Sequence, residues 1–315
     1  MSNKRDRATA RAGRLSAANS AKRRLNPPCF FIDRNDVLWR RALLGGVAAA
    51  ALLAGATEQA KASVPSSPKC GSNWTWDPIT ATLTCTHDQS GGINNPGGVT
   101  TIKNLVVKDL TKNIAPPSGT PGISLGNSGD ATLYSSTGSF YISTAGDNAS
   151  GISVGAFGDA TIISAGQIST TGAHAHGITA SSDAGSSSIT STGNISTQGD
   201  DSAGIYSTSH GNNTVTSTGG VTTLGDNSQG IYANASGGCS KCELTKGEDM
   251  LSELFAFDSK LTITSTGNII TAGNYSNAIE AHSSSSILIT STGNLTTSGD
   301  RASGIFARAD RKSVV

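Results

Sequence analysis

Acidic residues that follow a glycine at regular intervals are the first group in this sequence that could do chemistry. Strings such as GNISTQGDDSAGIYS recur, and they place an acidic residue after glycine at Asp147, Asp200, Asp226 and Asp300. Carboxylates stacked about 5 Å apart in neighbouring strands repel each other unless they are solvated or bridged by a cation such as Ca²⁺. Alternatively, each Asp caps a turn by accepting hydrogen bonds from backbone amides. Because Ala173 and Asn274 take this place in two further copies, the pattern favours turn caps, and we expect no metal site.

Two histidines form the second group. His174 and His176 alternate in GAHAHGITA, so both lie on one face of an extended chain and could ligate a metal. No third ligand aligns with them, since His210 and His282 fall elsewhere in the repeat, and a solvated turn is favoured. The sequence also contains no Walker loop or HExxH motif. We therefore expect no catalytic residues and no cofactor.

Two close cysteine pairs form the third group. Cys70 and Cys85 bracket a segment with Trp74 and Trp76, and the pattern indicates a disulfide in a hairpin-like cap. Cys239 and Cys242 form a CxxC, which could be redox-active. The thioredoxin-like βαβ context is missing, so a structural disulfide is favoured there too. The CxxC opens an insertion in which apolar residues have helical spacing, namely Met250, Leu251, Leu254, Phe255 and Phe257.

The elements that must position these residues follow from an internal repeat. The repeated glycines are spaced by 26, 27, 26, 48 and 26 residues, at Gly146, Gly172, Gly199, Gly225, Gly273 and Gly299. Four residues before each glycine there is always an aliphatic residue. Six residues after it there is always isoleucine, at Ile152, Ile178, Ile205, Ile231, Ile279 and Ile305. A third apolar position precedes the next glycine, in segments such as TVTSTG and TITSTG.

This pattern predicts an all-β fold, a right-handed parallel β-helix with three short strands per coil of 26–27 residues. An antiparallel sandwich also uses short strands, but it does not need identical residues at a fixed spacing. We expect an N-terminal cap over residues 63–118 and the β-helix repeats over residues 119–315. One helical insertion is expected at about residues 237–260.

The first 62 residues have the character of an export signal. They carry a net charge of +8, whereas residues 63–315 carry −7. An uninterrupted apolar run over residues 42–56 follows Arg40 and Arg41, and it is too short to span a bilayer comfortably. Ala60-Lys61-Ala62 provides an A-x-A cleavage site. We expect a signal peptide over residues 1–62, a mature start at Ser63, no stable membrane span and no nucleic-acid partner.

With this basic leader, its A-x-A site, the STGNIxTxGDxSxGIxA repeats and the close cysteine pairs, the chain resembles an autotransporter passenger domain. The filamentous-haemagglutinin type of exoprotein is a close second resemblance. Membership of either family implies a Gram-negative source, passage through secretion machinery, and display at the cell surface or release outside the cell. For an autotransporter it also implies a C-terminal outer-membrane barrel, whose strand pattern this sequence does not contain. We therefore expect an N-terminal fragment.

The resemblance implies an adhesive or structural role with a host or abiotic surface as partner, and we expect no enzymatic activity. The main alternative is a carbohydrate-active β-helix enzyme, a polysaccharide lyase or hydrolase. Such an enzyme needs carboxylates and a basic residue on one lateral face, and Lys and Arg are nearly absent from the repeat apart from Arg301 and Arg308. This scarcity favours a surface-binding rod.

Overall fold

The computed structural model of the chain describes residues 70–71, 73–95, 101–237 and 259–310. These residues belong to one compact unit, Thr57–Val315. They form β-strands and no helix. The expected signal peptide, the helical segment of the insertion, and Cys239 and Cys242 lie outside the described residues.

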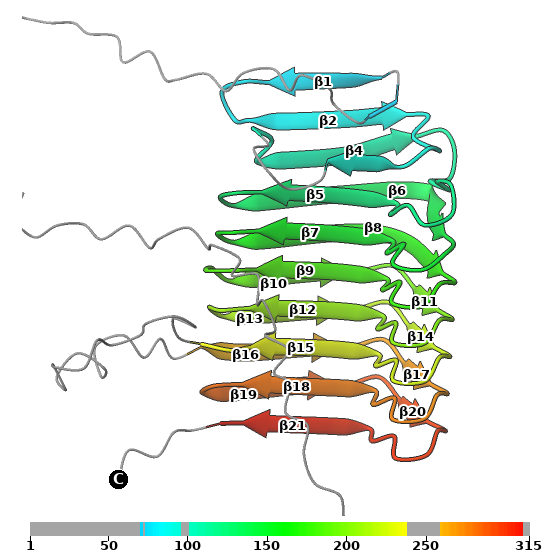
Figure 1. Cartoon of the computed structure of the whole chain (residues 1–315), viewed down its shortest axis with the longest axis vertical. Helices are drawn as coiled ribbons and strands as arrows, with labels where there is room; N and C mark the ends of the chain where they lie inside the picture. The colour runs from blue at the N-terminus through cyan, green and yellow to red at the C-terminus, as the bar shows by residue number, and fades with distance from the viewer. Residues whose placement is uncertain (1–69, 72, 96–100, 238–258, 311–315) are drawn as a thin grey trace, which may run out of the picture. The chain divides into compact units, whose positions relative to one another are not determined.

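One parallel sheet, sheet B, is built from the strands that carry the repeated isoleucine. Each strand pairs in register with those of the coils before and after it, so that Ile178, Ile205 and Ile231 are direct neighbours. Figure 1 shows these strands stacked along the solenoid. In spatial order they are β3 (Ile93–Asn95), β5 (Ile123–Asn127), β7 (Ile152–Ala156), β9 (Ile178–Ser182), β12 (Ile205–Ser209), β15 (Ile231–Ala235), β18 (Ile279–Ser283) and β21 (Ile305–Ala309).

The second sheet, sheet A, contains the strands that follow in each coil. Its main path comprises β1 (Trp74–Asp77), β2 (Thr82–His87), β4 (Asn104–Leu110), β6 (Ala131–Thr144), β8 (Ala160–Thr170), β10 (Ser187–Ser191), β13 (Asn213–Ser217), β16 (Lys260–Ser265) and β19 (Ser286–Ser291). A side branch forms the third face of the solenoid, with β11 (Ile195–Thr197), β14 (Val221–Thr223), β17 (Ile269–Thr271) and β20 (Leu295–Thr297).

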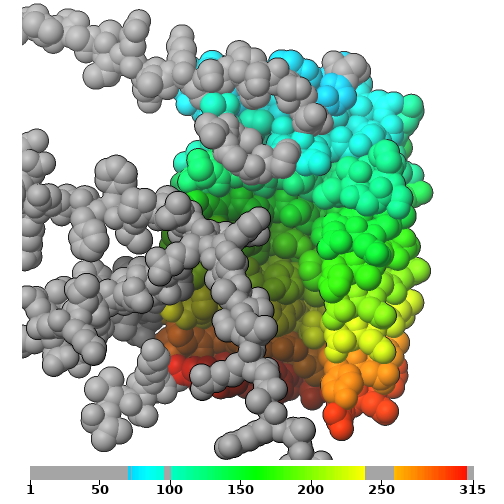
Figure 2. Space-filling model, viewed as in Figure 1, coloured from blue at the N-terminus to red at the C-terminus, as the bar shows by residue number. Residues whose placement is uncertain are grey.

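The predicted fold class, an all-β parallel β-helix with three strands per coil, is confirmed. All strand pairs are parallel except β1 with β2. The stack also reaches further toward the N-terminus than the six copies of the repeat, because β2, β3 and β4 already pair in parallel with later strands. These three strands lie within residues 63–118, the range expected to form the cap. Figure 2 shows the coils as successive bands of colour.

Alternation of inward and outward residues explains why such an apolar-poor chain folds. In β12 the inward residues Ile205, Ser207 and Ser209 are buried, while Tyr206 and Thr208 between them are partly exposed. Each coil that is covered by a further coil thus buries one aliphatic side chain per strand, and these coils together form one continuous core. A single coil could not bury its inward residues alone, so stability comes from stacking.

Several inward polar residues are hydrogen-bonded inside the solenoid. The buried Thr197, Thr223 and Thr271 each donate from Oγ1 to a backbone carbonyl five residues later, at 2.6–2.7 Å. The buried Asn213 donates to the carbonyls of Ser207 and Asn234. Because these groups have partners, burying them costs little.

The N-terminal end is closed by a hairpin. Strands β1 and β2 pair antiparallel, with Trp74 opposite Cys85. Cys70 and Cys85 are disulfide-bonded, with a Cα–Cα distance of 5.6 Å, and Cys85 is fully buried. The hairpin and the disulfide that the sequence indicates are therefore present.

The described ranges contain no helix with the length and apolarity needed to cross a membrane.

Candidate binding faces

The structure places the expected turn caps between coils. Oδ1 of Asp147, Asp200 and Asp226 each accepts a hydrogen bond from the backbone amide at the same position of the next coil, at 2.7–3.1 Å. Asn274 does the same for the amide of Asp300, at 2.9 Å. Asp300 lies in the last described coil, where no further amide is stacked on it. These side chains therefore join one coil to the next, which the sequence alone did not indicate.

The repeated isoleucines form one column on the inner side of sheet B. Ile152, Ile178, Ile205, Ile231 and Ile279 are fully buried. Ile305 occupies the same position of the repeat but is 48% exposed, because no described coil covers it.

The two histidines of GAHAHGITA lie in different environments. His174 has a positive φ of 54° and is exposed, with Nε2 4.0 Å from a carboxylate oxygen of Asp201. His176 instead stacks on Tyr206, with ring centroids 4.7 Å apart. Within the described residues no three His, Cys, Asp or Glu side chains come together in a way that could hold a metal ion.

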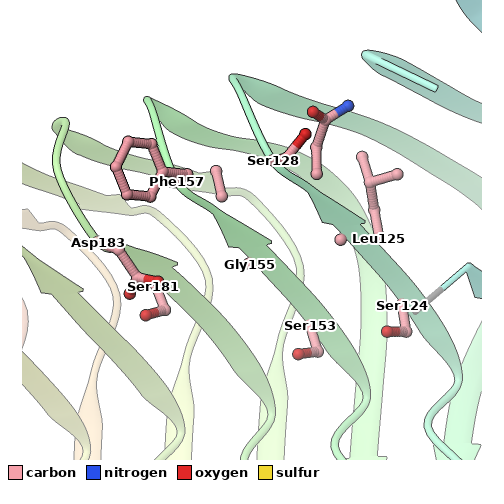
Figure 3. A pocket seen from close by; sticks show the side chains of 11 residues that line it. Ser124, Leu125, Ser128, Ser153, Gly155, Phe157, Ser181 and Asp183 are labelled. Carbon is pink, nitrogen blue, oxygen red and sulfur yellow. The ribbon is translucent and has the colours of Figure 1, made fainter. Parts of the chain in front are cut away.

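A groove of about 710 Å³ crosses the outer face of sheet B over β5, β7 and β9. It exists because the outward residues of these strands are small, including Ser124, Ser153, Gly155 and Ser181. A Cβ atom added at Gly155 would meet nothing within 4 Å. Figure 3 shows the serines on successive strands, with Phe157 beside the turns that follow them. Phe157 is 59% exposed, so the groove combines hydroxyl groups with one accessible aromatic ring.

A column of aromatic rings continues along the same sheet. Tyr206 and Tyr232 occupy the same outward position of neighbouring coils, and their rings stack with centroids 4.9 Å apart. His176 extends the stack at one end, and His282 and Phe306 extend it at the other, with centroid distances of 5.8–5.9 Å. Burial raises the pKa of both tyrosines, so their hydroxyls stay neutral donors at neutral pH. Sequence reasoning missed this column, although Tyr206, Tyr232 and Phe306 share one position of the repeat.

One carboxylate is built into this column. Glu280 is hydrogen-bonded to Nε2 of His282 and to Nδ2 of Asn277, both at 2.9 Å. Its side chain is only 17% exposed. The contacts hold the carboxylate in one orientation beside Tyr232, where it could accept hydrogen bonds from a bound molecule.

The pKa of His176 leads to a testable prediction. Burial, and secondarily His174, lowers its pKa from 6.5 to about 4, against the opposing effect of Asp201. Nδ1 of His176 also accepts the amide hydrogen of Ala203 at 3.0 Å, which requires the neutral ring. Between pH 6.5 and 4 the unfolded chain binds the proton and the folded chain does not. The free energy of unfolding should therefore fall as the pH is lowered from 6.5 to 4, by on the order of 2 to 3 kcal/mol.

Replacing His176 with asparagine should remove this pH dependence. Asn277 occupies the same position of another coil, and its Oδ1 accepts the amide hydrogen of Ser303 at 2.8 Å. Asparagine can therefore keep the hydrogen bond to Ala203 without titrating. Chemical denaturation at pH 7, 5.5 and 4.5 measures the effect, and an unchanged pH dependence in His176→Asn would refute this role of His176.

No protein-family model, no curated protein and no solved structure matches this chain.

Proposed function

We propose that this chain is an exported β-solenoid that binds a surface ligand through the outer face of sheet B and turns over no substrate. The observation that carries the proposal is the continuity of this face, on which the groove over β5, β7 and β9 is followed by the aromatic column from His176 to Phe306. Aromatic rings and hydroxyl groups in series along a rod suit an extended, weakly charged ligand such as a surface polysaccharide.

Export is supported by two features of different kinds. The basic leader, the apolar run over residues 42–56 and the A-x-A site have the order of a signal peptide. The disulfide between Cys70 and Cys85 suits an oxidising compartment outside the cytosol. The proposed location is therefore the cell surface or the extracellular medium.

A carbohydrate-active enzyme is the second candidate, and Glu280 is the observation that favours it. A carboxylate held by His282 beside aromatic rings resembles half of a glycosidase site. Glycoside hydrolysis usually needs two carboxylates about 5 to 9.5 Å apart. The hydrogen-bond partners of Glu280 are the amide of Asn277 and the imidazole of His282. Because neither partner is the second carboxylate that hydrolysis needs, this arrangement favours binding over hydrolysis.

Filling the groove tests the proposed binding face. We expect the full chain to be retained on immobilised polysaccharides or abiotic surfaces, and Gly155→Leu to weaken retention at least about tenfold, a loss of about 1.4 kcal/mol. The leucine points into open space, so thermal unfolding should be unchanged. Thr216→Leu, an outward replacement on sheet A of another coil, is the matched control and should be retained like the wild type.

Two results would count against the proposal. Equal retention of the wild type and Gly155→Leu would show that the groove is not the binding face. Release of new reducing or unsaturated ends from a glycan panel, abolished in Glu280→Gln, would instead identify an enzyme.

A further inference from the structure

A regular array of hydroxyl groups covers the outer face of sheet A over β10, β13, β16 and β19. Each of these strands overlaps one of the segments SITSTG, TVTSTG, TITSTG and LITSTG, in which every second residue points outward. Eleven of the twelve outward positions carry Ser or Thr, and Leu288 is the exception. By coil, the hydroxyl array comprises Ser188, Thr190 and Thr192; Thr214, Thr216 and Thr218; Thr262, Thr264 and Thr266; and Thr290 and Thr292.

The rows of the array are in register from coil to coil. Thr190 pairs with Thr216, Thr216 with Thr264, and Thr264 with Thr290. The third row follows the strand ends, and its backbone amides still bond to the preceding coil, as for Thr218 with Ser191 and Thr266 with Ser217. The hydroxyl array therefore forms a two-dimensional grid.

The outward hydroxyls of the array differ in their bonding from the inward threonines of the third face of the solenoid. Inward Thr197, Thr223 and Thr271 all donate to backbone carbonyls. None of the outward Ser or Thr side chains of the array is hydrogen-bonded to another described residue, and all of them are exposed or half-exposed. Their hydroxyl groups are therefore available to solvent or a ligand.

The fold does not require hydroxyls at these positions. In β8 the position next to Thr190 is Ile163, and in β6 it is Tyr134. Lys, Glu, Asp and Arg are also typical of exposed positions, but none occurs among the twelve. The high β-propensity of threonine explains part of the pattern, but isoleucine, valine and tyrosine share that propensity.

The grid spacing is close to that of an ice lattice. Neighbouring strands lie about 4.8 Å apart, and alternate residues of one strand are about 6.6–6.8 Å apart. In tetrahedral ice with O–H···O distances of about 2.75 Å, two waters that share a neighbour lie about 4.5 Å apart, and the lattice repeats after two layers at about 7 Å. Threonine is β-branched and stiff at χ1, so its hydroxyl and methyl groups hold fixed positions on the grid.

We propose that the hydroxyl array is an ice-binding face. Its ligand is a crystal surface of water, which is uncharged and offers alternating donors and acceptors, as the array does. A charged polymer finds no charged partner at the twelve positions, and a glycan finds no aromatic ring there on which to stack. This face lies on sheet A, so the proposal is independent of the ligand of sheet B.

Ice recrystallisation and ice partitioning test the proposal with the purified full chain. The wild type should partition into slowly growing ice and inhibit recrystallisation. Thr216→Tyr should need at least about tenfold more protein for the same inhibition, since its ring holds neighbouring rows away from a flat crystal face. Thr208→Tyr is the matched control, because Thr208 points outward from sheet B in the same coil. Equal thermal unfolding of both variants verifies the fold.

Three outcomes would overturn the proposal. The wild type could fail to partition into ice or to inhibit recrystallisation at any soluble concentration. The two tyrosine variants could lose activity equally, which would remove the link to the array. Retention on crystalline cellulose or chitin, lost in Thr216→Tyr without any effect of the wild type on ice, would assign the array to a polysaccharide.

Discussion

Replacing Ile205 with alanine should lower the free energy of unfolding by about 3 kcal/mol, within the range typical of isoleucine-to-alanine changes in a core. Ile205 is fully buried and pairs directly with Ile178 and Ile231 above and below it. The cavity cannot close easily, because the backbones of both neighbouring coils are fixed by their strand hydrogen bonds. Denaturant unfolding measures the loss, and faster amide exchange in β12 and β15 should locate it.

The chain provides a matched control for this prediction. Ile305 occupies the same position of the repeat but is 48% exposed, so Ile305→Ala leaves no closed cavity. Ile305→Ala should lower the free energy of unfolding by less than about 1 kcal/mol. Equal losses in the two variants would mean that coil stacking does not determine the contribution of each isoleucine.

Replacing Gly199 with alanine should destabilise the protein by at least about 3 kcal/mol, the upper end of overpacking effects. The added Cβ atom would overlap the backbone carbonyl of Gly172 in the preceding coil. A backbone oxygen in a stacked coil cannot rotate away as a flexible side chain can. The two coils must separate locally, and the hydrogen bond that the backbone amide of His174 donates to the carbonyl of Asp200 joins the same two coils at this turn.

Gly155→Ala is the control for Gly199→Ala. A Cβ atom at Gly155 meets nothing within 4 Å, so this variant should unfold like the wild type or slightly later. Thermal unfolding followed by circular dichroism distinguishes the two. A melting temperature unchanged in Gly199→Ala would contradict the close approach of the coils at this turn.

These glycines show where sequence reasoning needed the structure. The repeat indicates that the first glycine of each copy sits in a turn that requires either positive φ or close backbone approach. The structure separates the two reasons, since Gly199 and Gly225 do not have positive φ, whereas Asp201 and Asn227 do, at 54° and 53°. Glycine is required at Gly199 because the coils touch there. The left-handed residue lies two positions later.

The contact between His176 and Tyr206 in the aromatic column was not predictable from the repeat alone. His176 and Tyr206 occupy different positions of the repeat, four and seven residues after its glycine, and yet their rings stack. The contact depends on the direction in which each side chain leans across the gap between coils. A column of identical positions can be read from a sequence, but a contact between unlike positions needs the coil geometry.

The sequence repeat also did not predict the first coils of the solenoid. Strands β2, β4 and β3 stack in parallel like the later strands, but the segments between them vary in length and lack the repeated glycine. Stacking needs only an inward aliphatic residue in each strand, such as Leu83, Leu105 and Ile93, all fully buried. A strict sequence period is therefore not necessary for this fold.

The sequence by itself determined the all-β parallel β-helix, the three strands per coil and the inward column from Ile152 to Ile305. It could do so because each coil must present the same apolar residues to its neighbours. This physical requirement makes apolar residues recur at a regular spacing in the sequence. Only the tertiary structure decided which coil each Asp caps, where the groove and the aromatic column lie, and which threonines are bonded inside or free outside. Those properties depend on distances between neighbouring coils, and residues about 26 positions apart become neighbours only when the chain has folded.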